Sequence, residues 1–312
     1  MKLRNLLLIA CAAVIFCNCK SYEPTFLNVA SYNLRNANGS DSAQGNGWGQ
    51  RYPVIAQMVQ YHEFDIFGTQ ECFIHQLKDM KKALPGYDYI GVGRDDGKEK
   101  GEHSAIFYRT DKFDLIEKGD FWLSETPNVP SKGWDAVLPR ICSWGHFKCK
   151  DTGFEFLFFN LHMDHIGKKA RVESAFLVQK KMNELGANLP AILTGDFNVD
   201  QTHPSYDALV SKGVLYDSYE KSDFRYATNG TFNSFFTNSF TKSRIDHIFI
   251  SPVFHVKKYG VLTDTYRSLK NGGKADVKDC PEEIDVKSYE ARTPSDHFPI
   301  KAELIFDKRS KK

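Results

Sequence analysis

Pro190-Ala191-Ile192-Leu193-Thr194-Gly195-Asp196-Phe197-Asn198 is the stretch that decides the fold of this chain. Its apolar first half is typical of a short buried strand, and its second half places a carboxylate and a carboxamide two residues apart where that strand ends. In open sheets, ligands collect at the ends of such strands. Gly, Asp and Asn also form ordinary turns, so the stretch alone is better explained by a turn. Its meaning depends on the rest of the chain.

Polar side chains recur at the ends of other predicted strands, namely Asn33, Glu71, His162, Asp246 and the pair Asp296-His297. Any one of them alone is explained by a structural role, such as a hydrogen-bonded Asp-His pair or a neighbour of a helix cap. Together they supply a carboxylate suited to a metal, two histidines, an Asp partner and two amides. That set is hard to assign to structure alone.

Short apolar, β-branched or aromatic runs predict strands at residues 26–34, 64–68, 87–92, 105–108, 154–161, 191–193, 245–250 and 298–305. Helical spacing of apolar residues predicts helices at residues 52–61, 73–84 and 170–185. Strand also follows strand directly in residues 104–122 and 140–161, with hairpin-like breaks between. Mixed sheets covered by outer helices account for both patterns, strands separated by helices and strands that follow one another directly.

Six motifs occur in a characteristic order along the chain: Ser31-Tyr32-Asn33, Gly68-Thr69-Gln70-Glu71, Asn160-Leu161-His162, Gly195-Asp196-Phe197-Asn198, Arg244-Ile245-Asp246-His247-Ile248 and Ser295-Asp296-His297-Phe298-Pro299. In these motifs the chain resembles the endonuclease/exonuclease/phosphatase superfamily. The resemblance implies the deoxyribonuclease I-like fold, an α/β (α+β) four-layer αββα sandwich with two packed mixed β-sheets. It also implies hydrolysis of a phosphoester with Mg²⁺ or Mn²⁺.

The resemblance assigns metal and phosphate roles to named positions. Glu71 resembles the principal metal ligand, with Asn33 beside it and Asp296 as a further or water-mediated ligand. His162 and Asn198 resemble the groups that hold the non-bridging phosphate oxygens. A hard divalent cation suits this oxygen-rich set, because Mg²⁺ keeps several waters and needs few carboxylates.

The remaining motif residues are expected to handle the attacking water and its proton. Asp196 resembles the group that positions or deprotonates the water, and His297, oriented by Asp246, would contact the phosphate from the opposite side. The sequence leaves open whether Asp196 or His297 is the base. A carboxylate has a low unperturbed pKa, so Asp196 needs a tuned environment to accept a proton at neutral pH.

Five further residues are candidate substrate contacts. Some family members carry an acid two positions after the Asn of the first motif, where this chain has Arg35, which offers a cation near the phosphate or a partner for Glu71. Arg94 and His103 belong to a segment dense in charge and glycine ahead of a strand, as expected of a loop at the strand ends. Trp48 and Trp122 lie in or beside predicted loops, where a sugar or base could stack, although buried packing explains each equally simply.

The N-terminus has the pattern of an export signal. Lys2 and Arg4 precede an apolar run at residues 6–16, which is too short to span a bilayer comfortably. Cys19 and the polar residues after it resemble a bacterial lipoprotein signal. We assign residues 1–19 to a signal peptide and expect a lipid-anchored protein on the periplasmic or cell-surface side, the alternative being ordinary cleavage and secretion.

Charge bears on the substrate. Loss of residues 1–18 removes Lys2 and Arg4 from 41 basic residues, which leaves 39, equal to the 39 acidic residues. Proteins that hold long nucleic acid usually show a basic balance, so nucleic acid is a possible partner but not the favoured one. We favour a phosphodiesterase or phosphatase acting on a small, glycan-linked or lipid-linked phosphate. An extracellular scavenging nuclease is the alternative, and a non-catalytic surface binding module on the same fold is a third, disfavoured by the complete motif set.

Residues 20–308 are expected to form one domain and a monomer, because neither a composition shift nor a linker divides them. Residues 264–293 lack the periodicity that predicts strands and helices elsewhere in the chain. They are polar and contain Gly272-Gly273 and Pro281. A structureless connection of this length usually has a function or is mobile. We expect it to be a loop insertion over the site.

Overall fold

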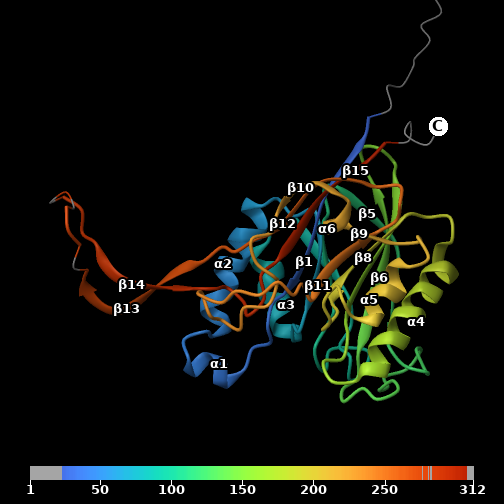
Figure 1. Ribbon diagram of the computed structural model, residues 1–312, viewed down its shortest axis with the longest axis horizontal. Coiled ribbons are helices and arrows are strands. Elements are labelled where there is room, and N and C mark those ends of the chain that lie inside the picture. The colour runs from blue at the N-terminus through green and yellow to red at the C-terminus, as the bar shows by residue number, and fades with distance from the viewer. Residues whose placement is uncertain (1–22, 276, 280, 282, 308–312) are drawn as a thin grey trace, which may run out of the picture.

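The apolar runs pair into two β-sheets that pack face to face, with helices on both outer faces (Figure 1). The computed structural model describes residues 23–275, 277–279, 281 and 283–307, so the expected signal peptide at residues 1–19 lies outside the described residues. The α+β four-layer sandwich expected from the resemblance is confirmed. No helix within the described ranges is long and apolar enough to cross a membrane.

The larger sheet has the strand order β10-β12-β15-β1-β2-β4-β3. Its strands are β1 Thr25–Asn33, β2 Ile66–Gln70, β3 Tyr87–Ile90, β4 Ile106–Arg109, β10 Ser222–Tyr226, β12 His255–Val261 and β15 Ile300–Phe306. The sheet is mixed, because β1 runs parallel to β2 and antiparallel to β15.

The smaller sheet has the order β5-β6-β7-β8-β11-β9. Its strands are β5 Phe113–Trp122, β6 Ile141–Cys149, β7 Glu155–His162, β8 Ala191–Asp196, β9 Tyr216–Asp217 and β11 Asp246–Ile250. It too is mixed, with β7 and β8 parallel and β8 and β11 antiparallel.

Helices cover the outer face of each sheet. They are α1 Gly39–Ala43, α2 Trp48–Tyr61, α3 Ile74–Ala83, α4 Lys168–Gly186, α5 Pro204–Val210 and α6 Ser218–Lys221. The apolar faces of α2 and α3 pack on the larger sheet, where Val59 and Leu77 share a cluster with Phe67. Those of α4 and α5 pack on the smaller sheet, where Val178 and Leu209 share a cluster with Phe159.

Alternation along the strands carries polar groups into the space between the sheets. In β8, Ile192 lies in the core between the two sheets, whereas its neighbour Leu193 lies in the outer core under the helices. Successive side chains of a strand point to opposite faces. Thr194 and Asp196 therefore share the inner face with Ile192, and the buried space changes from apolar to polar toward the strand ends.

Asn160 joins the two sheets where this change occurs. Its Nδ2 donates across the gap to Thr69 O at 2.8 Å and to Ala105 O at 3.0 Å. Its Oδ1 accepts from Gln70 Nε2 at 2.7 Å and from Thr194 Oγ1 at 3.0 Å. All four hydrogen-bonding positions of this buried amide are thereby satisfied, as a polar group in a core requires.

The loop expected at residues 264–293 is corrected by the structure. Residues Tyr266–Lys274 (β13) and Lys287–Arg292 (β14) pair as an antiparallel two-stranded ribbon, which projects away from the sandwich in Figure 1 instead of covering the site. None of the described side chains of this ribbon, at residues 266–269 and 287–292, belongs to an apolar cluster, so these strands need no alternation of apolar and polar residues that a sequence pattern would reveal. Arg292 anchors the base of the ribbon by donating to Gln44 O and Asn46 Oδ1.

We predict that Gly68→Ala destabilises the protein by about 1–3 kcal/mol, the usual cost of overpacking a core. A Cβ at Gly68 would lie 2.1 Å from Asn160 Oδ1 and 2.3 Å from Thr194 Oγ1, so the polar layer would have to shift. Urea unfolding measures the effect. Gly49→Ala in α2 is the control, because its Cβ would meet nothing within 4 Å and alanine favours helices. Equal stability of Gly68→Ala and the wild type would contradict the role given to this layer.

Candidate active site

A cavity of about 450 Å³ opens where the strands of both sheets end. Six of the eight predicted catalytic and metal-binding residues line it: Glu71, His162, Asp196, Asn198, Asp296 and His297. Asn33 and Asp246 are fully buried behind this wall. The larger sheet contributes Asn33 and Glu71 from neighbouring parallel strands, whereas His162 and Asp196 end parallel strands of the smaller sheet.

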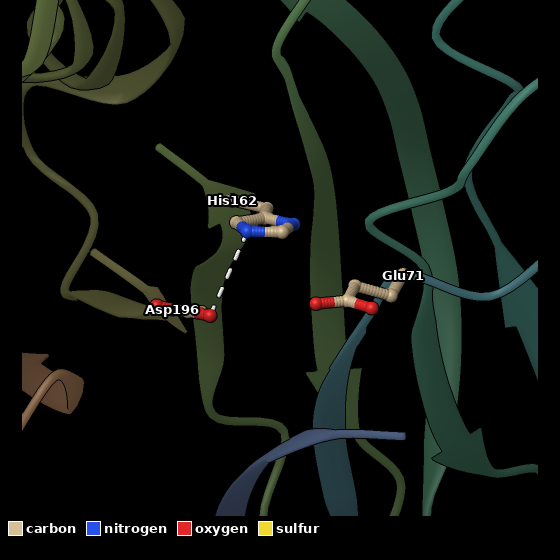
Figure 2. Close-up of side chains that lie close together, drawn as sticks. All are labelled: Glu71, His162 and Asp196. Atoms are coloured by element: carbon tan, nitrogen blue, oxygen red, sulfur yellow. Dashed lines mark ion pairs between the residues drawn. The ribbon is translucent and has the colours of Figure 1, made fainter. Parts of the chain in front are cut away.

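Glu71, His162 and Asp196 point toward one another across the gap between the sheets (Figure 2). Asn33 connects the two carboxylates, since its Nδ2 lies 3.0 Å from Glu71 Oε1 and 3.0 Å from Asp196 Oδ2. The Oδ1 of Asn33 accepts the backbone N–H of Arg35 at 2.9 Å. Asn33 therefore presents its amide nitrogen to Glu71 and Asp196 and orients both carboxylates, and its role as a metal ligand stays a prediction.

The backbone is strained at four positions around the cavity. Arg35, Glu71, Asn198 and Ser234 have φ angles of 56°, 66°, 51° and 53°, in the left-handed region that residues with a Cβ rarely adopt. Each such residue costs of the order of 1–3 kcal/mol, and such strain tends to cluster at functional sites. At Glu71 the strained turn directs the carboxylate back over the end of β2, where Asn36 N and Nδ2 donate to its Oε2.

His297 is held by two carboxylates. Its Nδ1 lies 2.9 Å from Asp246 Oδ2, and its Nε2 lies 3.7 Å from Asp196 Oδ2. Asp246 and Asp196 are register partners on β11 and β8, which explains why one ring reaches both. Burial would lower the pKa of His297, but the charges of Asp246 and Asp196 outweigh it and hold the pKa well above its usual range. The two carboxylates thereby favour the imidazolium form of the ring.

The pKa of His162 is shifted in the opposite direction to that of His297. Burial lowers its pKa well below the usual range, and the charges of Arg140 and Arg94 lower it further, so the ring is neutral. Asn198 Nδ2 lies 3.1 Å from His162 Nε2 and 3.0 Å from Met163 O. Because the Asn198 amide donates, His162 Nε2 is the acceptor and the proton resides on Nδ1, which has no partner among the described residues.

Asp196 is tuned for proton transfer. Its pKa is raised to about 7: burial is the largest cause, the charge of His297 opposes it, and the charge of Asp246 adds to it. Its Oδ1 accepts the backbone N–H of Asn198 at 2.9 Å, so both carboxylate oxygens have a fixed orientation. Asp296 is likewise raised in pKa, first by burial and then by the charge of Glu71, against the opposing effect of His297.

The residues present fit a hard divalent cation. Glu71, His162 and Asp196 each place a ligand atom within 4.8 Å of the others. Several carboxylates crowd one cavity, and the raised pKa values of Asp196 and Asp296 reflect burial together with neighbouring negative charge. A cation would relieve this repulsion, and oxygen-rich sites of this kind suit Mg²⁺ or Mn²⁺.

Two of the five expected substrate contacts line the cavity. Arg35 Nε donates to Asp41 Oδ2 at 2.8 Å, and its Nη1 lies 3.5 Å from Asp296 and 3.9 Å from Glu71. Arg94 also lines the cavity and pairs with Glu102 at 2.5 Å. Both place positive charge near the carboxylates.

The other three are buried supports that do not line the cavity, which corrects their expected role. Trp48 begins α2 and donates its indole N–H to Asp79, because the two glycines beside it start a helix and not a loop. Trp122 ends β5 and donates to Arg94 O at 2.7 Å. His103 lies behind Glu71, with its Nδ1 3.1 Å from Cys72 O.

Several lining residues were not predicted from the sequence, namely Asn36, Glu102, Leu138, Arg140, His165 and Phe232. Arg140 and Phe232 carry the most chemistry among them. Arg140 precedes β6, and Phe232 forms an isolated bridge with His297 from a long irregular segment. A lone Arg before a strand and a lone Phe in a loop have no distinguishing pattern, so only the fold could assign them.

Comparisons with known proteins agree with this geometry. Residues 30–297 match the model of the Endonuclease/Exonuclease/phosphatase family. A crystal structure of a member of that family from Bacteroides thetaiotaomicron is 81% identical, covers 93% of this chain and 98% of that chain, and superposes with a TM-score of 0.86. A mannosyl-6-phosphatase of Bacteroides thetaiotaomicron VPI-5482 is 82% identical over 90% of this chain and 100% of that chain, with a TM-score of 0.84.

More distant structures share the fold alone. The catalytic domain of human Nocturnin is 16% identical, covers 92% of this chain and 98% of that chain, and has a TM-score of 0.64. Likeness at this level supports the arrangement of the two sheets and says nothing of the substrate.

We predict that Asp246→Asn lowers the pKa of His297 by about 1–3 pH units, the usual effect of losing a neighbouring opposite charge. Loss of the carboxylate 2.9 Å from Nδ1 removes the largest interaction that favours the imidazolium. An NMR pH titration of the ring measures the shift. Asp223→Asn is the control variant. It removes a carboxylate 2.8 Å from a different histidine, the exposed His255, so the titration of His297 should not change. A His297 pKa that is unchanged in Asp246→Asn would contradict this assignment.

We predict that Mg²⁺ raises the melting temperature more at about pH 8 than at about pH 5, because protons compete with a metal for the same carboxylates. The pKa of Asp196 lies at about 7, so this group is largely ionised in the first condition and protonated in the second. Each kcal/mol of binding energy corresponds to roughly 2–4 °C. Calorimetry of the wild type, Glu71→Gln and the exposed control Glu117→Gln measures it. A shift retained in Glu71→Gln would remove Glu71 as the metal ligand.

Proposed function

The chain belongs to the endonuclease/exonuclease/phosphatase family, and on that basis we propose that it hydrolyses phosphate monoesters of sugars, above all mannose 6-phosphate groups, with Mg²⁺ or Mn²⁺ held at Glu71. The observation that carries the proposal is the 82% identity to a mannosyl-6-phosphatase over the full length of that chain. The catalytic groups expected of a phosphoester hydrolase lie around one cavity in this chain.

The metal would be held by Glu71, with Asp296 beside it, and supplies positive charge at the phosphoryl oxygens. Asn33 holds the Glu71 carboxylate in place at 3.0 Å. Phosphoryl transfer depends mainly on positioning and on compensation of the charge spread over the phosphoryl oxygens. His297 and His162 both line the cavity, and the charge that Asp246 and Asp196 favour on His297 would add to the positive potential there.

Asp196 is our choice for the general base. A group with a pKa of about 7 is partly ionised at neutral pH and still basic enough to accept a proton from water. His297 is already protonated at this pH, because its pKa lies well above the usual range. The water oxygen forms a bond to phosphorus while its proton passes to Asp196. The bond from phosphorus to the sugar oxygen breaks, and that oxygen leaves with the electron pair and takes a proton from solvent.

The surface beside the cavity supports a sugar as the leaving group. Phe232 lies edge-on to His297 at 5.1 Å between ring centroids and is 42% exposed. Phe236 and Phe240 are 68% and 67% exposed and line, with Phe232, an adjoining hollow of about 340 Å³. Exposed aromatic rings offer apolar faces on which the C–H face of a sugar ring can pack. A cavity of about 450 Å³ is also in the range of small-ligand sites.

We predict that the purified protein with Mg²⁺ hydrolyses mannose 6-phosphate at least about 10²-fold more efficiently than it cleaves single-stranded DNA or RNA, the level of discrimination that site contacts supply. Phosphate release and gel assays measure the two reactions, and EDTA should abolish both. Asp196→Asn is the matched control against contaminating phosphatases and should lose about 10²–10⁴-fold, the usual contribution of a general base. Rapid cleavage of the polymers with intact mannose 6-phosphate would favour the scavenging nuclease instead.

A further inference from the structure

Two arginines on the cavity wall have unused hydrogen-bond donors. Arg94 and Arg140 are only 8% and 4% exposed, and both line the cavity that holds Glu71 and His162. Arg94 Nε and Arg140 Nη1 are buried and have no hydrogen-bond partner among the described residues, and the carboxylate of Asp95 lies 4.0 Å from Arg94 Nε. A buried charged donor left unpaired is costly, so two of them beside a reaction site point to a ligand that completes the pairing.

Arg140 is held so that one nitrogen remains available. It directly precedes β6, whose Cys142 pairs with Leu161 of β7, and so it lies beside the strand end that carries His162. Its Nε donates to Asp164 Oδ2 at 3.3 Å, and its Nη2 donates to His165 Nδ1 at 3.0 Å. These two contacts fix the plane of the guanidinium and leave Nη1 free.

Arg94 is fixed from the neighbouring loop in a similar way. Its Nη1 donates to Glu102 Oε2 at 2.5 Å, and its backbone N–H donates to Glu102 O at 3.0 Å. The indole of Trp122 donates to the carbonyl of Arg94 at 2.7 Å. The loop therefore behaves as a rigid support, and the charges of Arg94 and Arg140 both act on His162 at the centre of the site.

We propose that Arg94 and Arg140 together bind the third terminal oxygen of a phosphate monoester, and that this pair makes the enzyme select monoesters over diesters. This inference rests on the proposed function. A monoester has three terminal oxygens and carries two negative charges above a pKa of about 6. A diester has two terminal oxygens and one charge. Rigid guanidinium groups with free N–H donors match the additional oxygen and the additional charge.

The test compares p-nitrophenyl phosphate with bis-p-nitrophenyl phosphate, which release the same leaving group. Arg140→Met and Arg94→Met should each lower kcat/KM for the monoester by roughly 10–100-fold, as expected for loss of a hydrogen bond to a charged group. The diester should lose less than about threefold, since it has no third terminal oxygen. Inorganic phosphate should inhibit both variants more weakly than the wild type, by a similar factor.

Two further variants separate binding from folding. Arg140→Lys keeps a cation for Asp164 but has one nitrogen in place of three, so it should show the same selective loss as Arg140→Met. Arg171→Met is the matched control: Arg171 is 7% exposed and donates to Asp164 O at 2.9 Å, but it does not line the cavity. Arg171→Met should keep the wild-type ratio of monoester to diester hydrolysis.

Equal losses on both esters in the Arg94 and Arg140 variants, or no loss on the monoester, would overturn the inference. Failure of the proposed function has a different signature. If the wild type prefers p-nitrophenyl phosphate over the diester but leaves mannose 6-phosphate intact, the proposed sugar substrate is wrong. The role of the arginine pair is then still decided by the Arg94 and Arg140 variants on the two chromogenic esters. If the wild type hydrolyses neither chromogenic ester, the proposed function itself fails.

Discussion

The amide of Asn160 is the interaction on which the rest of the structure depends. It joins β7 of one sheet to Thr69 and Ala105 of the other through hydrogen bonds of 2.8 and 3.0 Å. The candidate site is shared between the same two sheets, with Glu71 on one side and His162 and Asp196 on the other. A slip of one residue in a strand would turn its side chains to the opposite face. The polar layer therefore sets the alignment on which the geometry of the cavity depends.

Around the cavity, several features of the chain lower its stability. Carboxylates are buried close together, a protonated His297 lies between two of them, and Arg35, Glu71 and Asn198 adopt strained backbone conformations. The apolar cores on either side of each sheet stabilise the fold enough to retain these features. The same features give the site its chemistry: a carboxylate with a pKa near neutrality, a fixed cation and a neutral imidazole with a free N–H.

Much of this arrangement could be predicted from the sequence, because it follows from strand alternation. Once residues 190–198 are taken as a strand that ends at Asp196, the inner face and the position of the site follow, and the other motif residues join it at neighbouring strand ends. The side-chain roles are harder to predict. Asn33 belongs to the expected metal motif, yet its amide nitrogen faces the carboxylates because the oxygen accepts from the backbone of Arg35.

Residues outside the motifs could not be assigned from local pattern. The glycines beside Trp48 suggested a loop, whereas the residue begins a helix and packs in the core. Arg140 is an isolated arginine before a strand, and only the pairing of β6 with β7 brings it to His162. The ribbon of β13 and β14 could not be predicted for a different reason: its described side chains belong to no apolar cluster, so its sequence needs no apolar alternation.

The central claim is that the aligned strand ends of the two sheets build one metal-dependent phosphoester site. A crystal structure of the protein grown with Mn²⁺ and inorganic phosphate, with the metal located by its anomalous scattering, tests it most directly. The account predicts a metal on the Glu71 carboxylate and a phosphate between it and His162, within reach of Asp196 and His297. A metal bound away from Glu71, or a cavity that holds neither ion, would contradict it.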